Sequence, residues 1–232
     1  MGVCTLRLHG YPVSNYFNIV RAALIEKGVD FQIELTRPSQ DPAFLSRSPM
    51  GKIPVLETEE GWLSETIAIL EYLEDRVSTP ALQPSDPFDR AKGRQIINIV
   101  QLYVELPVRT LFPGVFFGGS NDESTREEAR RMLDRATGAL ARLMVPEPYL
   151  LGPSLSHADL FSFYCLEIAD RVTRFVYGRS IVSEIDGLAN WWRRIAARES
   201  TVVVLADFHP AFRAYLQTNA AAYSESSSNG LG

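Results

Sequence analysis

GKIPVLETEEGWLSET, residues 51–66, is the stretch of sequence that decides the fold. Pro54 has no backbone N–H to donate, so it predicts the beginning of a short strand over residues 55–57. The turn Glu59–Gly61 then reverses the chain into a second strand. If the Ile53-Pro54 peptide bond is cis, the Ile53 N–H and C=O both face outward and pair with a peptide-like ligand as a strand does. The stretch therefore predicts a proline-fixed loop followed by a tight hairpin.

A helix is predicted to begin directly after this hairpin. Ser64 is a favourable N-cap, and Glu65 and Thr66 follow it in the first turn. Apolar residues continue at helical spacing, at Ile67, Leu70, Leu73 and Val77. Free N–H groups at a helix start attract a carboxylate, and the Glu65 side chain can pair with an ammonium group. The segment therefore predicts a site for the carboxylate and amino groups of an amino acid.

The residues before this segment supply a strand, a loop and a helix. An alternating strand at residues 6–8 is interrupted by Gly10-Tyr11-Pro12. Ser14-Asn15 offers an N-cap for a helix that ends at Gly28, and a second strand follows at residues 31–35. The predicted order of elements in the first part of the chain is β-α-β and then α-β-β-α.

The second half of the chain has a different pattern. Residues 78–87, STPALQPSDP, form a linker rich in proline and small polar residues, and no strand-like alternation follows it. The remainder is therefore predicted to be helical. Ser156 and Asp159 stand three residues apart, as an N-capping box requires, and the helix after them is apolar on nearly every face. We assign Asp159 a structural role rather than a catalytic one.

With these elements in place, the chain resembles a soluble, cytosolic-type bacterial glutathione S-transferase over nearly its whole length. The resemblance lies in YPVSN at residues 11–15, GKIPVL at 51–56 and SET at 64–66. It implies an α/β thioredoxin-like N-terminal domain followed by an all-α helical-bundle domain, with glutathione as co-substrate. We expect the first domain over residues 1–79, the helical domain over 87–223 and a low-complexity tail over 224–232.

The nucleophile that this resemblance implies is the thiol of bound glutathione. A free thiol with a pKa of ~8.5 is only about 3% thiolate at pH 7, and lowering the pKa to ~6.5 makes it roughly three-quarters thiolate. A hydroxyl hydrogen bond and a helix start together supply the ~2.7 kcal/mol that this shift needs. Aligned through the first helix, Ser14 matches the thiolate-stabilising hydroxyl of the serine-using classes. Tyr11, Tyr16, the amide of Asn15 and a purely capping role for Ser14 remain open alternatives.

The same resemblance implies how the rest of glutathione is bound. Ile53 pairs its backbone with the cysteinyl part, and Glu65 with Thr66 holds the γ-glutamyl end. Lys52, together with Gln40, faces the glycyl carboxylate.

An apolar pocket for the electrophile is expected between the YPV loop and the long helix after the linker. Its candidate residues are aromatic: Tyr103, Phe112, Phe116, Phe117, Phe208 and Phe212. Pro107 is expected to kink the long helix. The sequence leaves the electrophile unidentified, because apolar pockets discriminate weakly between ligands.

These expectations describe a cytoplasmic, homodimeric transferase that activates the glutathione thiol for attack on a small hydrophobic electrophile, or for reduction of a peroxide. Two alternatives stay open: a non-catalytic binding or regulatory protein on the same scaffold, and a glutathione-dependent disulfide reductase, which Asn15 supports. Maleylacetoacetate isomerases resemble S-S-C-S-W-R at the first helix. This chain reads SNYFNI at residues 14–19, so that activity is not expected.

Composition fits this interpretation and excludes other classes of protein. The 232 residues carry a net charge of −5 with a sequence pI near 5.3, which argues against a nucleic-acid-binding surface. No apolar run approaches the ~20 residues that cross a bilayer, so no membrane association is expected. Cys4, Cys165 and the three histidines are too scattered for a metal site, and we expect both cysteines to be buried core thiols. The composition of residues 224–230, SESSSNG, predicts disorder.

Overall fold

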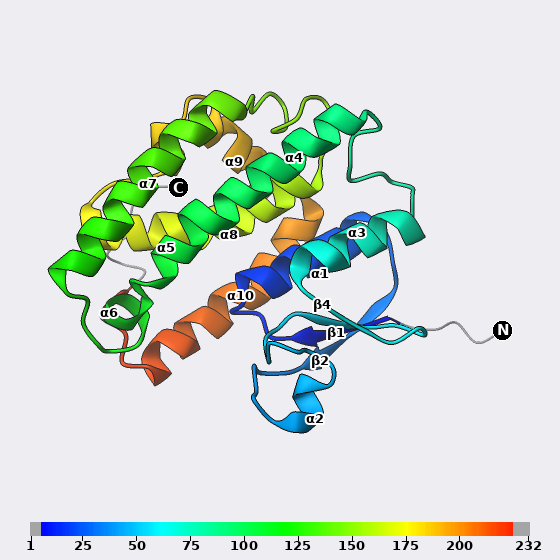
Figure 1. The fold of residues 1–232 in the computed structure, drawn as a ribbon, viewed down its shortest axis with the longest axis horizontal. Helices are drawn as coiled ribbons and strands as arrows, with labels where there is room; N and C mark the ends of the chain where they lie inside the picture. Colours follow the sequence, from blue (N-terminus) through cyan, green and yellow to red (C-terminus); the bar gives the residue numbers. More distant parts are fainter. Residues whose placement is uncertain (1–5, 225–232) are drawn as a thin grey trace.

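The computed structural model describes residues 6–224 and begins with a 4-stranded mixed sheet (Figure 1). The strands are β1 (Leu6–Gly10), β2 (Phe31–Leu35), β3 (Val55–Glu57) and β4 (Trp62–Ser64), in the spatial order β2-β1-β3-β4. β1 runs parallel to β2 and antiparallel to β3, with Leu8 opposite Ile33 and Leu56. β3 and β4 form the predicted hairpin, and the Ile53-Pro54 bond before it is cis.

Helices α1 (Asn15–Glu26) and α3 (Thr66–Arg76) cover one face of this sheet, and the short α2 (Pro42–Leu45) lies on its other side (Figure 1). Helix α1 is buried on two sides because it contributes to two hydrophobic cores. Phe17, Val20 and Leu24 pack in a small core with β1, β3 and α3. Ile19, Ala22 and Ala23 pack in a large core with the helices of the second half. As predicted, α1 ends just before Gly28, which has a positive φ of 62°.

The start of α3 differs from the prediction that Ser64 is its N-cap. Ser64 instead ends β4, opposite Val55, and the N-cap is Glu65 with φ 71° and no side-chain capping bond. The reason is that Ser64 continues the hairpin, so the whole change of direction from strand to helix falls on Glu65. A left-handed conformation is uncommon for a residue other than glycine, and such residues concentrate at functional sites.

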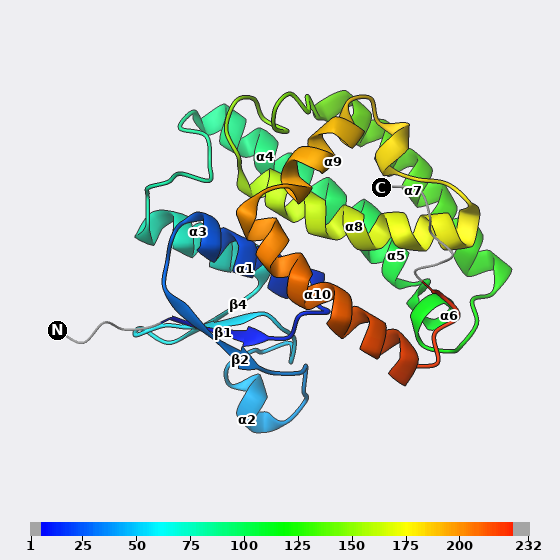
Figure 2. The ribbon, with the colours of Figure 1, turned by 180° about the vertical axis from the view of Figure 1, so that it is seen from behind.

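The second half of the described chain is helical (Figures 1 and 2). Its elements are α4 (Pro87–Ile99), the π-helix η1 (Val100–Glu105), α5 (Leu106–Arg109), α6 (Phe112–Phe116), α7 (Glu123–Leu143), α8 (His157–Tyr177), the 3-10 helix η2 (Val182–Glu184), α9 (Leu188–Ala196) and α10 (Glu199–Thr218). Both α8 and α10 contact α1, and Figure 2 shows α10 running beside it. The predicted fold class, an α/β thioredoxin-like part followed by an all-α part, is confirmed.

The long helix after the linker is irregular where Pro107 was expected to kink it. Its register widens to a π-helix over η1, so that the Leu106 N–H donates to the carbonyl of Gln101. A proline ring collides with the carbonyl four residues earlier in a regular α-helix, and the wider turn before Pro107 relieves that collision. The change of register also turns Glu105 into the interior, where it is fully buried.

Asp159 lies at the start of α8 and serves the structural role that the capping box predicted. Its carboxylate accepts bonds from the Ser156 N–H at 2.9 Å and the Ser156 hydroxyl at 2.6 Å. It also accepts from the Leu150 N–H and the Trp191 indole N–H, both at 2.8 Å. One buried side chain therefore joins the start of α8 to α9 and to the loop before α8.

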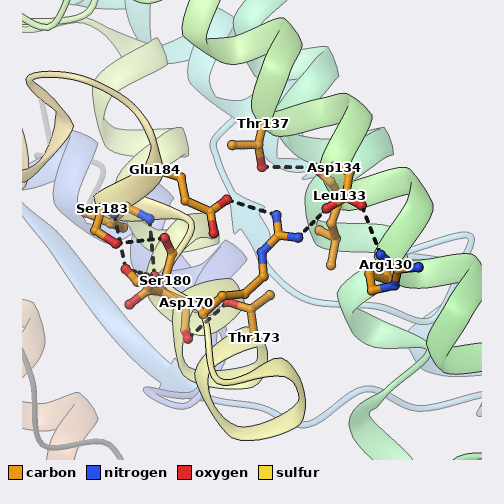
Figure 3. A network of polar contacts seen from close by, with 11 residues as sticks. Arg130, Leu133, Asp134, Thr137, Asp170, Thr173, Ser180, Ser183 and Glu184 are labelled. Carbon is orange, nitrogen blue, oxygen red and sulfur yellow. Dashed lines mark hydrogen bonds and ion pairs between the residues drawn. The ribbon is translucent and has the colours of Figure 1, made fainter.

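The other end of α8 is held by a second polar network, drawn in Figure 3. Asp170 accepts from the Ser180 hydroxyl at 2.7 Å and the Val182 N–H at 3.2 Å, which fixes the loop after α8. Arg179 in that loop bonds Glu184 at 2.9 Å and also pairs with Asp134 of α7. These contacts fasten α7, α8 and η2 together on the side of the molecule away from the sheet.

Cys165 is fully buried in α8, as expected of a core thiol, whereas Cys4 lies outside the described residues. All but the first residue of the predicted tail, residues 224–232, also lies outside them. Between residues 6 and 224, no helix is both long and apolar enough to cross a membrane. In the same part of the chain, acidic, histidine and cysteine side chains form no group that could hold a metal ion.

Candidate active site

A cleft of about 590 Å³ lies where the sheet half meets the helical half. Its walls come from the loop before α1, the first turns of α1 and α3, the loop before β3, and helices α5, α6, α8 and α10. It brings together most of the predicted site residues: Tyr11, Ser14, Asn15, Tyr16, Lys52, Ile53, Glu65 and Thr66. The conformation of each residue decides what it can offer a ligand.

Ser14 is the N-cap of α1, and its geometry leaves a hydrogen-bond donor available. The backbone of Ser14 is extended, with φ −78° and ψ 116°, and its Oγ accepts from the Phe17 N–H at 3.3 Å. That bond uses a lone pair of the oxygen and leaves the O–H free to point elsewhere. Among the described residues, no acceptor takes this O–H. Ser14 can therefore cap the helix and donate to a ligand atom at the same time.

Asn15 and Tyr16 are engaged in a buried network that reaches into the helical half. The Asn15 amide nitrogen donates to Glu105 at 3.2 Å and to Cys165 Sγ at 3.6 Å, and its oxygen accepts from Arg109 at 3.0 Å. The amide thereby uses both of its N–H groups and its carbonyl. The Tyr16 hydroxyl donates to Glu105 at 3.0 Å. Neither side chain has a donor left for a thiolate unless this network breaks.

Burial also affects the protonation of Tyr16 and Cys165. Removal from water, with the nearby Cys165 and Glu105, raises the pKa of the Tyr16 hydroxyl. Burial, followed by the charge of Glu105, likewise raises the pKa of the Cys165 thiol, so it stays protonated and is a poor nucleophile. Tyr11 is the remaining competitor of Ser14. It lines the cleft, and its ring lies 4.7 Å from the Arg37 guanidinium.

The loop before β3 presents the backbone of Ile53 to the cleft. With the Ile53-Pro54 bond cis, the Ile53 N–H and C=O have no hydrogen-bond partner among the described residues. The buried Ser48 hydroxyl fixes the preceding residue, because it accepts from the Lys52 N–H at 3.1 Å and donates to the Lys52 carbonyl at 2.8 Å. The Lys52 side chain is exposed and lines the cleft. The loop thus offers an edge for a peptide and a cation beside it.

Glu65 and Thr66 occupy the start of α3. Thr66 is buried as the first residue of the helix, and the Glu65 side chain is exposed in the cleft. Glu65 lines the cleft and, with φ 71°, directly precedes the free N–H groups of the helix start. A carboxylate next to such N–H groups matches a ligand that carries an ammonium and a carboxylate on one carbon.

Among the residues predicted to bind glutathione, Gln40 is the one that does not line the cleft. Its side-chain amide donates to the Met50 carbonyl at 3.4 Å. Gly51, with φ 65°, allows this close approach, because a Cβ there would lie 2.3 Å from both the Gln40 amide and the Ser39 carbonyl. Gln40 therefore supports the loop that carries Lys52, and its contact with the glycyl carboxylate stays a prediction.

The expected aromatic pocket lines the helical side of the cleft, with one correction. Its aromatic lining residues are Tyr16, Phe112, Phe116, Phe117, Tyr164, Phe208, Phe212 and Tyr215. Tyr103 is not among them and is 44% exposed. Tyr103 lies within the π-helix η1, whose wider turn alters which side chains of this helix face the cleft.

Glu105 and Arg109 are site residues that sequence reasoning missed. The Glu105 carboxylate is fully buried and accepts from Arg109 at 2.5 Å, and the Arg109 guanidinium lines the cleft within 5.3 Å of the Tyr16 and Phe112 rings. A signal was present: Glu105 is the one acidic residue in the apolar run IINIVQLYVELP at residues 96–107. A buried carboxylate needs hydrogen-bond donors or a cation beside it. A single acidic residue in an apolar helix therefore indicates that such groups contact it in the folded protein.

Comparison with known proteins agrees with this geometry. Residues 8–81 match the family model for the glutathione S-transferase N-terminal domain, and residues 96–199 match the C-terminal domain model. A glutathione S-transferase from Pseudomonas putida is 43% identical over 186 residues, which cover 80% of this chain and 82% of the relative. A maleylacetoacetate isomerase from Pseudomonas aeruginosa is 30% identical over 216 residues, covering 90% of this chain and 94% of that protein.

Solved structures agree with the fold. The crystal structure of glutathione transferase F2 from Populus trichocarpa aligns with a TM-score of 0.75 over 88% of this chain and 99% of that chain, at 20% identity. The two domain models, the Pseudomonas putida relative and a cleft with an unpartnered peptide edge beside a helix start lead to one conclusion: the chain belongs to the glutathione S-transferase family and is an enzyme whose co-substrate is glutathione.

Proposed function

We propose that the protein is a serine-using glutathione transferase in which Ser14 donates a hydrogen bond to the thiolate of bound glutathione. The observation that carries this proposal is the free O–H of Ser14, whose Oγ is already the N-cap acceptor for Phe17. The rival donors Asn15 and Tyr16 are bonded to Glu105. The start of α1 adds a partial positive charge beside the sulfur. Together these interactions lower the thiol pKa and raise the thiolate fraction at neutral pH.

We further propose that each part of glutathione binds a different wall of the cleft. Ile53 binds the cysteinyl backbone with its unpartnered N–H and C=O. Glu65 and the first-turn N–H groups near Thr66 hold the ammonium and carboxylate of the γ-glutamyl end. Lys52 is the cation for the glycyl carboxylate. Holding the peptide at both ends and in the middle fixes the sulfur near Ser14, and such positioning supplies a large share of the acceleration.

The second substrate in this proposal is a small hydrophobic electrophile. The aromatic side of the cleft favours it, with peroxide reduction as a further activity of the same thiolate. We do not propose isomerisation of maleylacetoacetate, because SNYFNI at residues 14–19 departs from the isomerase pattern. Asn15 has no free N–H to favour disulfide reduction, since Glu105 and Cys165 take both.

We further propose a cytoplasmic homodimer with domain boundaries near residues 79 and 87. Phe88 is 69% exposed on α4, and Leu102 and Tyr103 are 47% and 44% exposed on η1. A symmetric contact between two copies would remove these apolar side chains from water. Sedimentation equilibrium tests the dimer directly, and a monomeric mass at micromolar concentration contradicts it.

The Ser14 assignment is tested by titrating the thiolate absorbance of the glutathione complex. We expect the thiol pKa near ~6.5 in the wild type and a return toward ~8.5 in Ser14→Ala, which cuts the thiolate at pH 7 about 25-fold. The less acidic thiol is intrinsically more nucleophilic, so the rate at pH 7 falls only about three- to hundredfold and recovers partly toward pH 9. The affinity for glutathione stays nearly unchanged.

Two matched variants separate the chemical role of Ser14 from its capping role. Ser14→Thr keeps both a cap and a hydroxyl, so it retains most of the lowered pKa. Tyr11→Phe removes the competing hydroxyl and leaves the pKa as in the wild type. An identical thiol pKa in wild type and Ser14→Ala transfers the role to Tyr11, and failure of glutathione to bind at millimolar concentration contradicts the proposed function as a whole.

A further inference from the structure

Arg109 is a charged side chain of the cleft that the proposed binding of glutathione leaves unassigned. The charged residues among the described lining residues are Lys52, Glu65, Arg109 and Glu167. Lys52 and Glu65 are proposed for the two ends of glutathione, and Glu167 pairs with Arg171 at 2.5 Å. Arg109 is therefore the charge that remains for the second substrate.

Contacts from three elements fix the position of the Arg109 guanidinium. Its Nε–H donates to the buried Glu105 carboxylate of η1 at 2.5 Å, and an Nη2–H donates to the Asn15 amide oxygen of α1 at 3.0 Å. The guanidinium carbon lies 5.3 Å from the ring centres of Tyr16 and Phe112, which both line the cleft. The group is thus held beside the aromatic side of the cleft by α1, η1 and α6.

The guanidinium keeps donors that these contacts do not use. It carries five N–H groups in a planar fork, and the bonds to Glu105 and Asn15 take two of them. Within residues 6–224 the other three have no acceptor, and 39% of the Arg109 side chain is exposed, so a ligand can reach it. Nη1 and Nη2 therefore keep a parallel pair of N–H groups, the arrangement that binds the two oxygens of a carboxylate.

Arg109 also lies close to the expected position of the reacting sulfur. Its partner Asn15 directly follows Ser14, the residue proposed to contact the thiolate, and all three line the cleft. A ring attached to that sulfur would lie among the aromatic side chains of the cleft, such as Phe112 beside Arg109. A polar group on the ring is therefore in a position to meet the guanidinium.

The charge on this side of the cleft favours an anion. Tyr215 lines the cleft, and burial together with the nearby Tyr11 raises the pKa of its hydroxyl, whereas the charges of Arg37 and Arg109 oppose that rise. Two cations therefore act on this part of the cleft. The Glu105 carboxylate offsets only one of them, so the excess charge is positive.

We propose that Arg109 binds a carboxylate carried by an aromatic electrophile, an inference that rests on the proposed function of the cleft. The two carboxylate oxygens accept from Nη1 and Nη2, while the ring packs among residues such as Phe112 and Phe116. A neutral oxygen gains the hydrogen bonds without the attraction of charge, and an ammonium is repelled. Arg109 is thus a specificity-determining residue for the second substrate.

The test uses thioethers of glutathione, which measure binding without any reaction. S-benzyl glutathiones that carry a carboxylate, a carbamoyl or a methyl group on the ring are titrated calorimetrically, with each group at the meta and the para position. In the wild type we expect the carboxylate to bind about 5- to 20-fold more tightly than the methyl compound in at least one series. The carbamoyl compound should bind within about threefold of the methyl compound, and added salt should reduce the carboxylate preference.

Three variants separate binding of the ligand from pairing with Glu105. Glu105→Gln removes the anion that competes for Arg109, so the carboxylate preference should rise about two- to fivefold. The double variant Glu105→Gln/Arg109→Gln leaves neither charge unpaired and should bring the ratio to about one, with the methyl compound bound within about threefold of the wild type. Arg109→Lys keeps a cation beside Glu105 but has no fork, and it should lose about half of the preference or more.

Arg130→Gln makes the same change of charge on the exposed face of α7 and is the matched control, which should keep the wild-type ratio. Equal wild-type affinities for the carboxylate and methyl thioethers overturn the inference, as does a carbamoyl thioether that binds as tightly as the carboxylate. A preference that persists in the double variant also overturns it. Titration of glutathione itself keeps the two proposals apart: if it binds and the thioethers do not differ, only the role of Arg109 is wrong.

Discussion

At the scale of single residues, the site depends on side chains whose other hydrogen bonds are already fixed. Ser14 illustrates this, because its helix-capping bond to Phe17 sets the position of the oxygen that would contact sulfur. Asn15 illustrates the opposite case, since Glu105, Arg109 and Cys165 use its whole amide. Sequence alone placed both residues at the helix start and favoured Ser14 by resemblance, but it could not show that the amide of Asn15 is already used. The difference arises from η1, some 90 residues later in the chain.

Glu65 gives a prediction at this scale. Glu65→Gln removes the charge proposed to pair with the γ-glutamyl ammonium and should weaken glutathione binding by ~1.5–2 kcal/mol, or about 10- to 30-fold, without changing the fold. Calorimetric titration of both proteins measures the effect. Glu59→Gln, in the exposed hairpin turn, is the control and should bind as the wild type does. Equal dissociation constants for wild type and Glu65→Gln would move the γ-glutamyl contact elsewhere.

At the scale of elements, local patterns correctly predicted the strands, the hairpin and the capping box at the start of α8. The β3 strand over residues 55–57 and the β2 strand over 31–35 follow from alternation and from Pro54. The errors fall where tertiary contacts override local preference. Ser64 has good capping chemistry, but pairing with Val55 keeps it in β4. Tyr103 was expected in the cleft as one of the aromatic residues of the long helix, but it lies in the π-helix η1 and does not line the cleft.

Asp159 gives the prediction for elements. Its carboxylate accepts from Ser156, Leu150 and Trp191, so Asp159→Ala leaves several buried donors without a partner. We expect the free energy of unfolding to fall by about 3–5 kcal/mol, while activity per folded molecule changes little. Urea denaturation followed by circular dichroism measures the loss.

Asp122, which only caps a helix, is the control for the Asp159→Ala experiment. Asp122 caps the exposed start of α7 with a bond to the Thr125 N–H at 2.7 Å. Asp122→Ala should therefore cost only about 1 kcal/mol. If the two alanine variants lose the same amount, the bonds to Leu150 and Trp191 contribute nothing beyond capping. A folded Asp159→Ala protein without activity would instead contradict the structural assignment.

At the scale of the whole molecule, charged contacts join the sheet half to the helical half. Glu26 at the end of α1 accepts two bonds from Arg198 at 2.6 Å, and Arg198 precedes α10. The Ser200 hydroxyl bonds the same carboxylate at 2.5 Å. Burial alone would raise the pKa of Glu26, but the hydrogen bonds from Arg198 and Ser200 outweigh it and lower that pKa. Such a contact between distant segments has no local sequence signal.

The lowered pKa fixes the sign of a pH effect. The folded protein holds the Glu26 proton less tightly than the unfolded chain, so the pair contributes stability above the unfolded pKa of about 4.3. That contribution is lost as the pH falls from about 5 through the lowered pKa. Glu26→Gln should therefore reduce the melting temperature at pH 7, and the gap to the wild type should narrow below about pH 4. Thermal melts at several pH values measure this gap.

The matched control is Glu127→Gln, whose partner Arg130 lies on the exposed face of α7. That pair is open to solvent and should leave the melting temperature nearly unchanged at every pH. A gap for Glu26→Gln that stays constant down to pH 3 would show that charge on Glu26 is irrelevant and that only its packing matters.

The burial of α1 in two hydrophobic cores has a consequence for how the protein unfolds. Its Phe17, Val20 and Leu24 belong to one core and its Ile19, Ala22 and Ala23 to the other, so neither core survives removal of this helix. The two halves should therefore behave as one cooperative unit in denaturant. The slowest-exchanging amide protons of β1 and α8 should report the same opening free energy by native-state hydrogen exchange. Different opening free energies for β1 and α8 would mean that one half can unfold while the other stays folded. The helices that line the cleft could then unfold while the sheet remains intact.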